Sequence, residues 1–188
     1  MIQAMNSIDT ALFLWMNGLH AYWLNPVMVF ISGQIIWYPI LAFFLFICFK
    51  QLGSRSTLIF SLFILLAIIA SDTTSSQILK NIFMRLRPCR NDEVMDLLHQ
   101  FGQRCGGRFG FVSSHAANTF AATVFMIQAL NVSRKVKILA LLFPLLVSYS
   151  RIYLGVHYPG DVLGGALVGI GWGVLFSKIF LHHHGAKR

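Results

Sequence analysis

The chain has 188 residues, of which 56% are hydrophobic and only 11% are charged. This composition excludes an ordinary soluble domain and predicts one membrane-embedded domain over residues 1–188. The net charge of +9 could suggest nucleic acid, but the basic residues lie between apolar runs rather than on a basic helix face with interleaved aromatic residues, which argues against that partner.

The first 23 residues form an amphipathic segment that we expect to lie at the membrane interface. Apolar residues recur at helical spacing, and aromatic residues that favour the interface accompany them: Ile8, Leu12, Trp15, Met16, Tyr22 and Trp23. Ser7 is a candidate N-cap for this helix. The apolar run is short for a span, although a first, tilted span is the alternative.

Five apolar segments follow, each near the length that a bilayer requires, roughly 20 residues. They are Pro26–Phe49, Thr57–Leu79, Ser114–Leu130, Val136–Leu154 and Val162–Leu181. We therefore predict an all-α fold, a polytopic membrane bundle of about five to six transmembrane helices. The last segment carries five glycines, which either serve close helix packing alone or also form a tight wall beside a site: Gly164, Gly165, Gly169, Gly171 and Gly173.

One long polar loop, Asn81–Gly110, separates the second and third spans, and loops of this length are usually functional. Eight basic residues lie on the opposite side of the predicted bundle, against four on the loop's side once Lys80, Arg87 and Arg151 are set aside as candidate site residues. The positive-inside rule then predicts a cytoplasmic C-terminus and a loop outside. Cys89 and Cys105 share this loop, and in an oxidising compartment they could form a disulfide.

Charged residues also stand at the ends of apolar segments, where they are costly and usually functional. Lys80 and Arg87 are seven residues apart, so on a helix that Pro88 ends they would share a face and could hold phosphate oxygens. Taken alone, the two could equally be cations that extend to the interface. Further along, Ser113 or Ser114 can cap an apolar helix, whose free N–H groups attract anions.

Two histidines complete this set of polar residues. His115 falls in the first turn of the helix that Ser113 or Ser114 caps. His157 precedes Asp161 by four residues, with a turn at Pro159-Gly160 between them. The carboxylate can accept a hydrogen bond from one ring nitrogen of His157, which fixes the tautomer and leaves the other nitrogen free to attack.

Together these stretches resemble the three-part signature of the type 2 phosphatidic acid phosphatase superfamily. The signature has Lys, six residues and Arg-Pro, then Pro-Ser-Gly-His, then Ser-Arg, five residues, His, three residues and Asp. The first and third parts match at every defining position: Lys80, Arg87 and Pro88, then Ser150, Arg151, His157 and Asp161. The second part departs, because Val112 stands for Pro and Ser114 for Gly, while Ser113 and His115 are kept.

The resemblance implies a metal-independent lipid phosphatase, without a cofactor, in a bacterial inner membrane with its site facing the periplasm. His157 would be the nucleophile, Asp161 would orient it, and His115 would protonate the leaving oxygen and then activate water. The remaining site residues would hold the phosphoryl oxygens: Lys80, Arg87, Ser113, Ser114 and Arg151.

The resemblance also implies the partners, a membrane lipid phosphate and the bilayer itself. The candidate lipids are lipid A phosphate, undecaprenyl diphosphate, phosphatidylglycerol phosphate and phosphatidic acid. A lipid-to-lipid phosphotransferase would use the same residues, and non-enzymatic anion or lipid binding, or transport, is a further alternative. No metal site is expected, and the sequence does not predict the oligomeric state.

Overall fold

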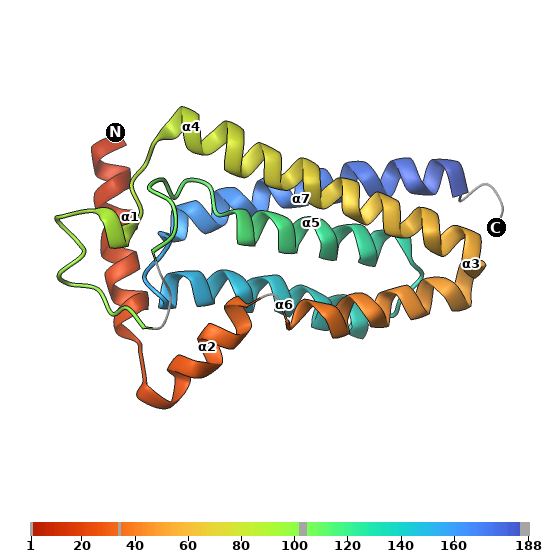
Figure 1. Cartoon of the computed structure of the whole chain (residues 1–188), viewed down its shortest axis with the longest axis horizontal. Helices are drawn as coiled ribbons and strands as arrows, with labels where there is room; N and C mark the ends of the chain where they lie inside the picture. The colour runs from red at the N-terminus through yellow and green to blue at the C-terminus, as the bar shows by residue number, and fades with distance from the viewer. Residues whose placement is uncertain (1, 34, 102–104, 185–188) are drawn as a thin grey trace.

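The computed structural model of the chain shows long helices side by side with a helix across one end (Figure 1). It describes residues 2–33, 35–101 and 105–184. The helices are α1 (Ile2–Gly18), α2 (Asn25–Ser32), α3 (Trp37–Asp72), α4 (Lys80–Phe83), α5 (Ser114–Ala129), α6 (Arg134–Tyr153) and α7 (Pro159–His184). A π-helical segment, Thr73–Leu79, joins α3 to α4, and 3-10 turns cover Tyr22–Leu24 and Pro88–Arg90. Since these ranges contain no strand, the predicted all-α class is confirmed.

Helix α3 consists of two antiparallel halves that meet at Gly53 (Figure 1). Gly53 has a φ of 81°, in the left-handed region that glycine adopts without a steric penalty. The predicted first span, Pro26–Phe49, was wrong at its start. Pro26 belongs to the short helix α2, which ends at Ser32, and the long helix begins only at Trp37.

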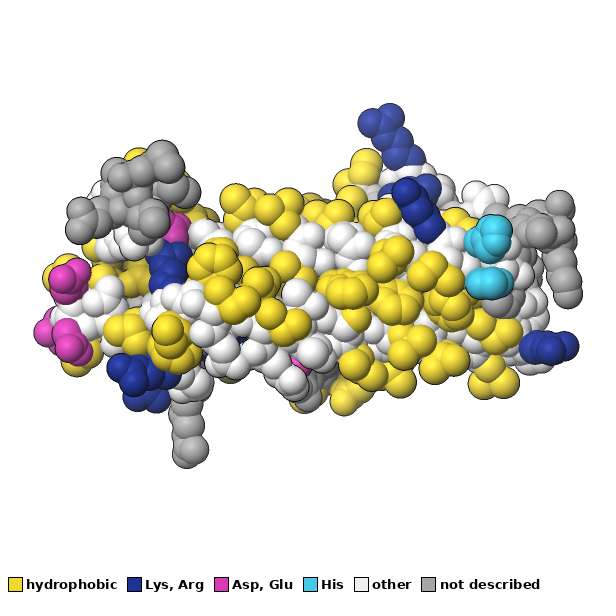
Figure 2. Space-filling model, turned by 90° about the horizontal axis from the view of Figure 1, so that it is seen from above, with side chains coloured by type: hydrophobic (Ala, Val, Ile, Leu, Met, Phe, Trp, Pro, Cys, Tyr) yellow, Lys and Arg dark blue, Asp and Glu magenta, His cyan; other side chains and the backbone are white. Residues whose placement is uncertain are grey.

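Three helices in the described ranges are long and apolar enough to cross a membrane: Trp37–Phe83, Arg134–Tyr153 and Pro159–His183. The first of them supplies two crossings, because it turns back at Gly53. The predicted span Ser114–Leu130 is instead the 16-residue helix α5, buried among the others. Apolar side chains cover the middle of the bundle surface, and charged ones lie mostly toward its ends (Figure 2), as a multi-pass membrane protein requires.

Close packing of α5 on α7 depends on glycines, as their spacing predicted. A Cβ atom at three positions of α7 would approach carbonyl oxygens of α5 to between 2.1 and 2.7 Å: Gly165 at Ser113, Gly169 at Ala117 and Gly173 at Ala121. Gly171, on another face of α7, would meet no atom within 4 Å. Small residues therefore bring the two backbones together along several turns.

We expect Gly169→Ala to lower the melting temperature in detergent clearly, because the added methyl group collides with the backbone of α5. Overpacking of this kind costs about 1–3 kcal/mol. The matched control is Gly171→Ala, which should leave the melting temperature unchanged or raise it, since alanine favours a helix. Equal melting temperatures for the two variants would contradict this account of the packing.

The N-terminal helix α1 lies across the end of the bundle (Figure 1). Phe13 and Asn17 are buried against the bundle, whereas Ile8 and Trp15 are 69% and 63% exposed. This arrangement agrees with the predicted amphipathic segment, whose exposed apolar face suits a membrane interface. Ser7 is not an N-cap, because the helix begins at Ile2.

The described members of the two groups of basic residues occupy opposite ends of the bundle, and Arg104, Lys187 and Arg188 lie outside the described residues. The turn at Gly53, the α5–α6 connection and the end of α7 lie at one end, while α1 and the long loop lie at the other (Figure 1). The compartment that each end faces stays a prediction.

Candidate active site

The polar loop reaches the site by a different path from the one predicted. Helix α4 ends at Phe83, and Met84 adopts a left-handed conformation with φ 45°. Beyond it, Leu86 pairs with Phe109 in an isolated bridge. The prediction that Lys80 and Arg87 share one helix ended by Pro88 was therefore wrong, since the chain leaves the helix three residues before Arg87.

A disulfide between Cys89 and Cys105 closes the loop directly after Arg87, with the two Cα atoms 5.9 Å apart. The cross-link limits how far the chain around Arg87 can move.

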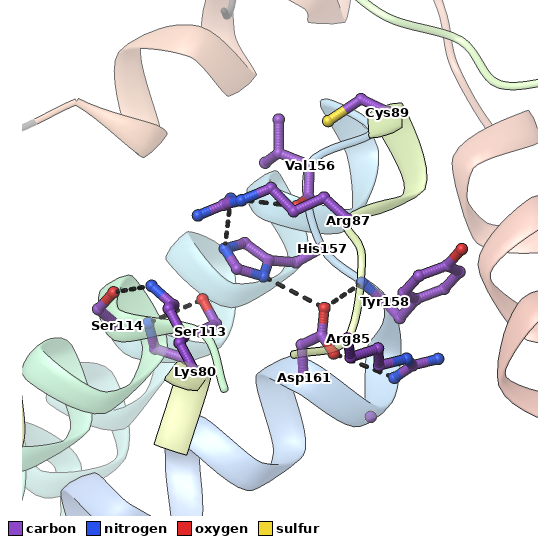
Figure 3. Close-up of polar contacts among 12 residues, drawn as sticks. Lys80, Arg85, Arg87, Cys89, Ser113, Ser114, Val156, His157, Tyr158 and Asp161 are labelled. Atoms are coloured by element: carbon purple, nitrogen blue, oxygen red, sulfur yellow. Dashed lines mark hydrogen bonds and ion pairs between the residues drawn. The ribbon is translucent and has the colours of Figure 1, made fainter. Parts of the chain in front are cut away.

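His157 and Asp161 form a buried pair at the start of α7 (Figure 3). His157 Nδ1 lies 3.3 Å from Asp161 Oδ2, which also accepts a hydrogen bond of 3.0 Å from the backbone N–H of Tyr158. The two side chains are 1% and 0% exposed. The carboxylate therefore holds the imidazole with its proton on Nδ1 and its lone pair on Nε2.

Arg87 faces that lone pair (Figure 3). Its Nη1 donates to the carbonyl oxygen of Val156 at 3.2 Å and lies 2.9 Å from His157 Nε2. Burial lowers the pKa of His157 well below its ordinary value, and the charges of Arg87, Arg151 and Lys80 lower it further. The imidazole is consequently neutral at pH 7, the state in which Nε2 is a nucleophile.

Ser114, which stands where the signature has glycine, holds the predicted phosphate ligand Lys80. Lys80 Nζ donates to Ser114 Oγ at 2.8 Å (Figure 3), and Ser76 Oγ lies 3.1 Å from the same oxygen. Ser113 caps α5 by accepting from the backbone N–H of Ala116, as predicted, and its own N–H donates to the carbonyl oxygen of Asp161 at 2.9 Å.

The other two predicted residues stand on either side of this group. Arg151, at the end of α6, is buried and donates to the hydroxyl of Ser32 on α2. His115 is exposed and faces a cavity of about 380 Å³ that lies beside Ser114. Two buried cations, Arg87 and Arg151, and the half-buried Lys80 thus surround a neutral imidazole, and a second imidazole lines an adjoining cavity. This arrangement can bind a phosphoryl group and exchange it.

Sequence reasoning missed the link between Asp161 and the N-terminal helix. Arg85 Nη1 lies 3.0 Å from Asp161 Oδ1 and 2.7 Å from Asp9 Oδ2. Asp9 also accepts from the backbone N–H of Gly160 at 2.8 Å. Asp9 could have been noticed because it is an acidic residue within an apolar segment. The sequence gives no indication that its partner is Arg85, because the two residues are far apart along the chain.

We expect Arg85→Met to lower kcat by about ten-fold with little change in KM, the scale found when a group that orients an active-site ligand is lost. Arg85 contacts Asp161 rather than the cations around His157, so it should affect turnover more than binding. The control is Arg90→Met, which removes an exposed cation bonded to the carbonyl oxygen of Gly106. A raised KM with unchanged kcat for Arg85→Met would contradict this role.

No three His, Cys, Asp or Glu side chains come together as a metal site within the described ranges. The family model of the PAP2 superfamily matches residues 60–184. The chain belongs to the PAP2 superfamily. This match covers most of the chain and every predicted site residue.

Relatives and a solved structure agree with this assignment. The PAP2 chain is 37% identical over 180 residues to the lipid A 4'-phosphatase of Bacteroides thetaiotaomicron, covering 95% of this chain and 80% of that protein. It is 29% identical over 176 residues to the lipid A 4'-phosphatase of Porphyromonas gingivalis, covering 93% and 74%.

The fold is similar to the crystal structure of a transmembrane PAP2 type phosphatidylglycerolphosphate phosphatase from Bacillus subtilis. The TM-score is 0.71 and the identity 24%, over 94% of this chain and 86% of that one. The predicted family, fold and enzyme class, a membrane lipid phosphatase, are confirmed.

Proposed function

We propose that this PAP2 protein hydrolyses a phosphate monoester of a membrane lipid through a phospho-histidine intermediate. The reaction takes place at the periplasmic face of a bacterial inner membrane. The observation that carries this mechanism is the geometry of His157. Its Nδ1 is bound to Asp161 and its Nε2 faces Arg87 at 2.9 Å. The excess of basic residues at the far end of the bundle and the disulfide at the near end support the periplasmic placement.

In the first step, His157 Nε2 attacks phosphorus and the bond from phosphorus to the ester oxygen breaks. Desolvation in the cavity and the neighbouring cations lower the pKa of His115 to about 3 in the free site, so its protonation requires the negative charge of the bound phosphate. His115 then gives its proton to the ester oxygen, which leaves as the lipid alcohol. The charge on the phosphoryl oxygens is neutralised by the cations Arg87, Lys80 and Arg151. To bind the substrate, Arg87 gives up its contact with His157 Nε2. Asp161 stabilises the imidazole ring as it becomes positive.

In the second step, neutral His115 takes a proton from water, and the resulting hydroxide attacks the phosphorus on His157. The bond between nitrogen and phosphorus breaks, inorganic phosphate leaves, and His157 returns to its neutral state. His115 is again protonated for the next cycle. Atoms, charge and protons balance without a metal ion.

Among the four candidate lipids, we propose lipid A phosphate as the substrate. Similarity to two lipid A 4'-phosphatases across most of this chain supports this choice. The test is phosphate release by the purified protein from lipid A, undecaprenyl diphosphate, phosphatidylglycerol phosphate and phosphatidic acid in mixed micelles. We expect the highest kcat/KM with lipid A and full activity in excess EDTA. Release from none of the four, or a strict metal requirement, would refute the proposal.

A further inference from the structure

The cavity beside His115 contains a carboxylate that the mechanism does not use. Asp72 is the last residue of α3, eight residues before Lys80, within a stretch that is apolar enough to cross a membrane. An acidic side chain at such a position is costly and is retained where it has a function. Asp72 lines the cavity together with His115, Asn118 and two aromatic residues, Trp37 and Tyr38.

Hydrogen bonds fix how this cavity presents its polar atoms. Asp72 Oδ1 accepts from Asn118 Nδ2 at 2.9 Å and lies 3.4 Å from Ser76 Oγ. The amide nitrogen of Asn118 must face the carboxylate, because an amide oxygen there would be repelled. Asn118 Oδ1 is itself buried, without a hydrogen-bond partner in the described part of the chain, so this amide positions the carboxylate rather than facing the cavity. The carboxylate of Asp72 therefore offers the hydrogen-bond acceptor, and a matching ligand must supply donors.

The position of the cavity indicates which part of a substrate enters it. The phosphoryl group belongs with Lys80, Arg87 and His157, and its leaving oxygen belongs next to His115. Asn118 lies about one turn further along α5 than His115, toward the middle of the bundle. The group attached to the leaving oxygen therefore occupies the cavity. A polyprenyl ester, or the diacylglyceryl ester of phosphatidic acid, would place carbon chains or carbonyl esters there, which have no donors for this carboxylate.

We propose that this cavity is a headgroup subsite for a sugar phosphate of a glycolipid, and that Asp72, held in place by Asn118, selects it by accepting hydrogen bonds from hydroxyl or amide N–H groups next to the phosphorylated carbon. This inference rests on the proposed function and adds the residues that choose the substrate. Trp37 and Tyr38 supply flat apolar surfaces against which the carbon face of a sugar ring can pack. A fixed acceptor that lines a binding cavity discriminates against ligands that lack the donor.

The experiment compares Asp72→Asn and Asn118→Leu with the parent protein on two micellar substrates, a lipid A phosphate and phosphatidic acid. For each variant we expect kcat/KM on lipid A to fall about ten-fold or more, while kcat/KM on phosphatidic acid stays within about two-fold. Lipid A without phosphate should inhibit the parent competitively and should inhibit both variants more weakly. The matched control is Thr74→Ser, because Thr74 lies two residues after Asp72 but faces Trp172 on α7.

Equal losses of kcat/KM on both substrates would overturn the inference, because they would mean that Asp72 acts through Lys80 or through the stability of the fold. The proposed phosphatase activity would stand in that case. Unchanged inhibition by the phosphate-free lipid would also overturn it. A parent protein that releases phosphate from neither substrate would overturn the proposed function, and this inference with it.

Discussion

Replacing His157 with alanine should lower phosphate release about a thousand-fold or more, because no other group in the site can take over the bond to phosphorus. The side chain is buried and bound on both ring nitrogens, so its loss removes the acceptor of the phosphoryl group. Activity should be measured as inorganic phosphate released from lipid A in detergent. Protein from the same purification, quenched in alkali during turnover of lipid labelled in its phosphate, should carry label only when His157 is present.

His99 supplies the matched control, because it is a histidine of the same end of the molecule outside the site. Its ring stacks on His20 with the ring centroids 3.8 Å apart. His99→Ala should keep the label and most of the activity. Label retained by His157→Ala, or activity within ten-fold of the parent, would contradict the assignment of the nucleophile.

Replacing His115 with alanine should lower turnover of lipid A by about 10²–10⁴-fold, the usual contribution of a general acid and base. Its effect should depend on the leaving group, unlike that of His157→Ala. An aryl phosphate expels a phenolate without help, so the first step should survive. The second step still requires a base, and the intermediate should accumulate.

The measurement is a burst of the phenol from p-nitrophenyl phosphate. His115→Ala should give a burst close to one equivalent of enzyme, followed by slow turnover. A loss of the burst as complete as that of His157→Ala would contradict the role of His115 as acid and base. His115 lines the cavity and lies close enough to the cations for their charges to act on it, which agrees with a residue that acts on the leaving oxygen and on water.

Much of the site could be predicted because its residues follow fixed short spacings. Asp161 follows His157 by four residues, and the first turn of α7 brings them together. The structure places the three predicted cations near His157, although the chain between Lys80 and Arg87 does not follow the predicted helix. Nothing local to the sequence indicates that Met84 turns into the left-handed region and ends the helix before Arg87.

Residues with distant partners were harder to predict. Asp9 reaches Arg85, and Asp72 reaches Asn118, across long stretches of chain, and no periodic pattern connects either pair. An acidic residue within an apolar segment was the available signal for both. The fold class followed from the apolar segments, but their ends did not, because Gly53 and the break after Ser32 set the helix bounds.

The glycine contact between α5 and α7 has an electrostatic consequence. Positions 113, 117 and 121 meet 165, 169 and 173 in the same order, so the two helices run parallel, with the start of α5 beside the second turn of α7. Each helix carries about half a positive charge at its N-terminus, and two such charges at the same end of the bundle repel each other. A bound phosphate offsets this repulsion, so the free energy that binds the anion also holds the two helices together. The charge comes from backbone amides, so it does not vary with pH.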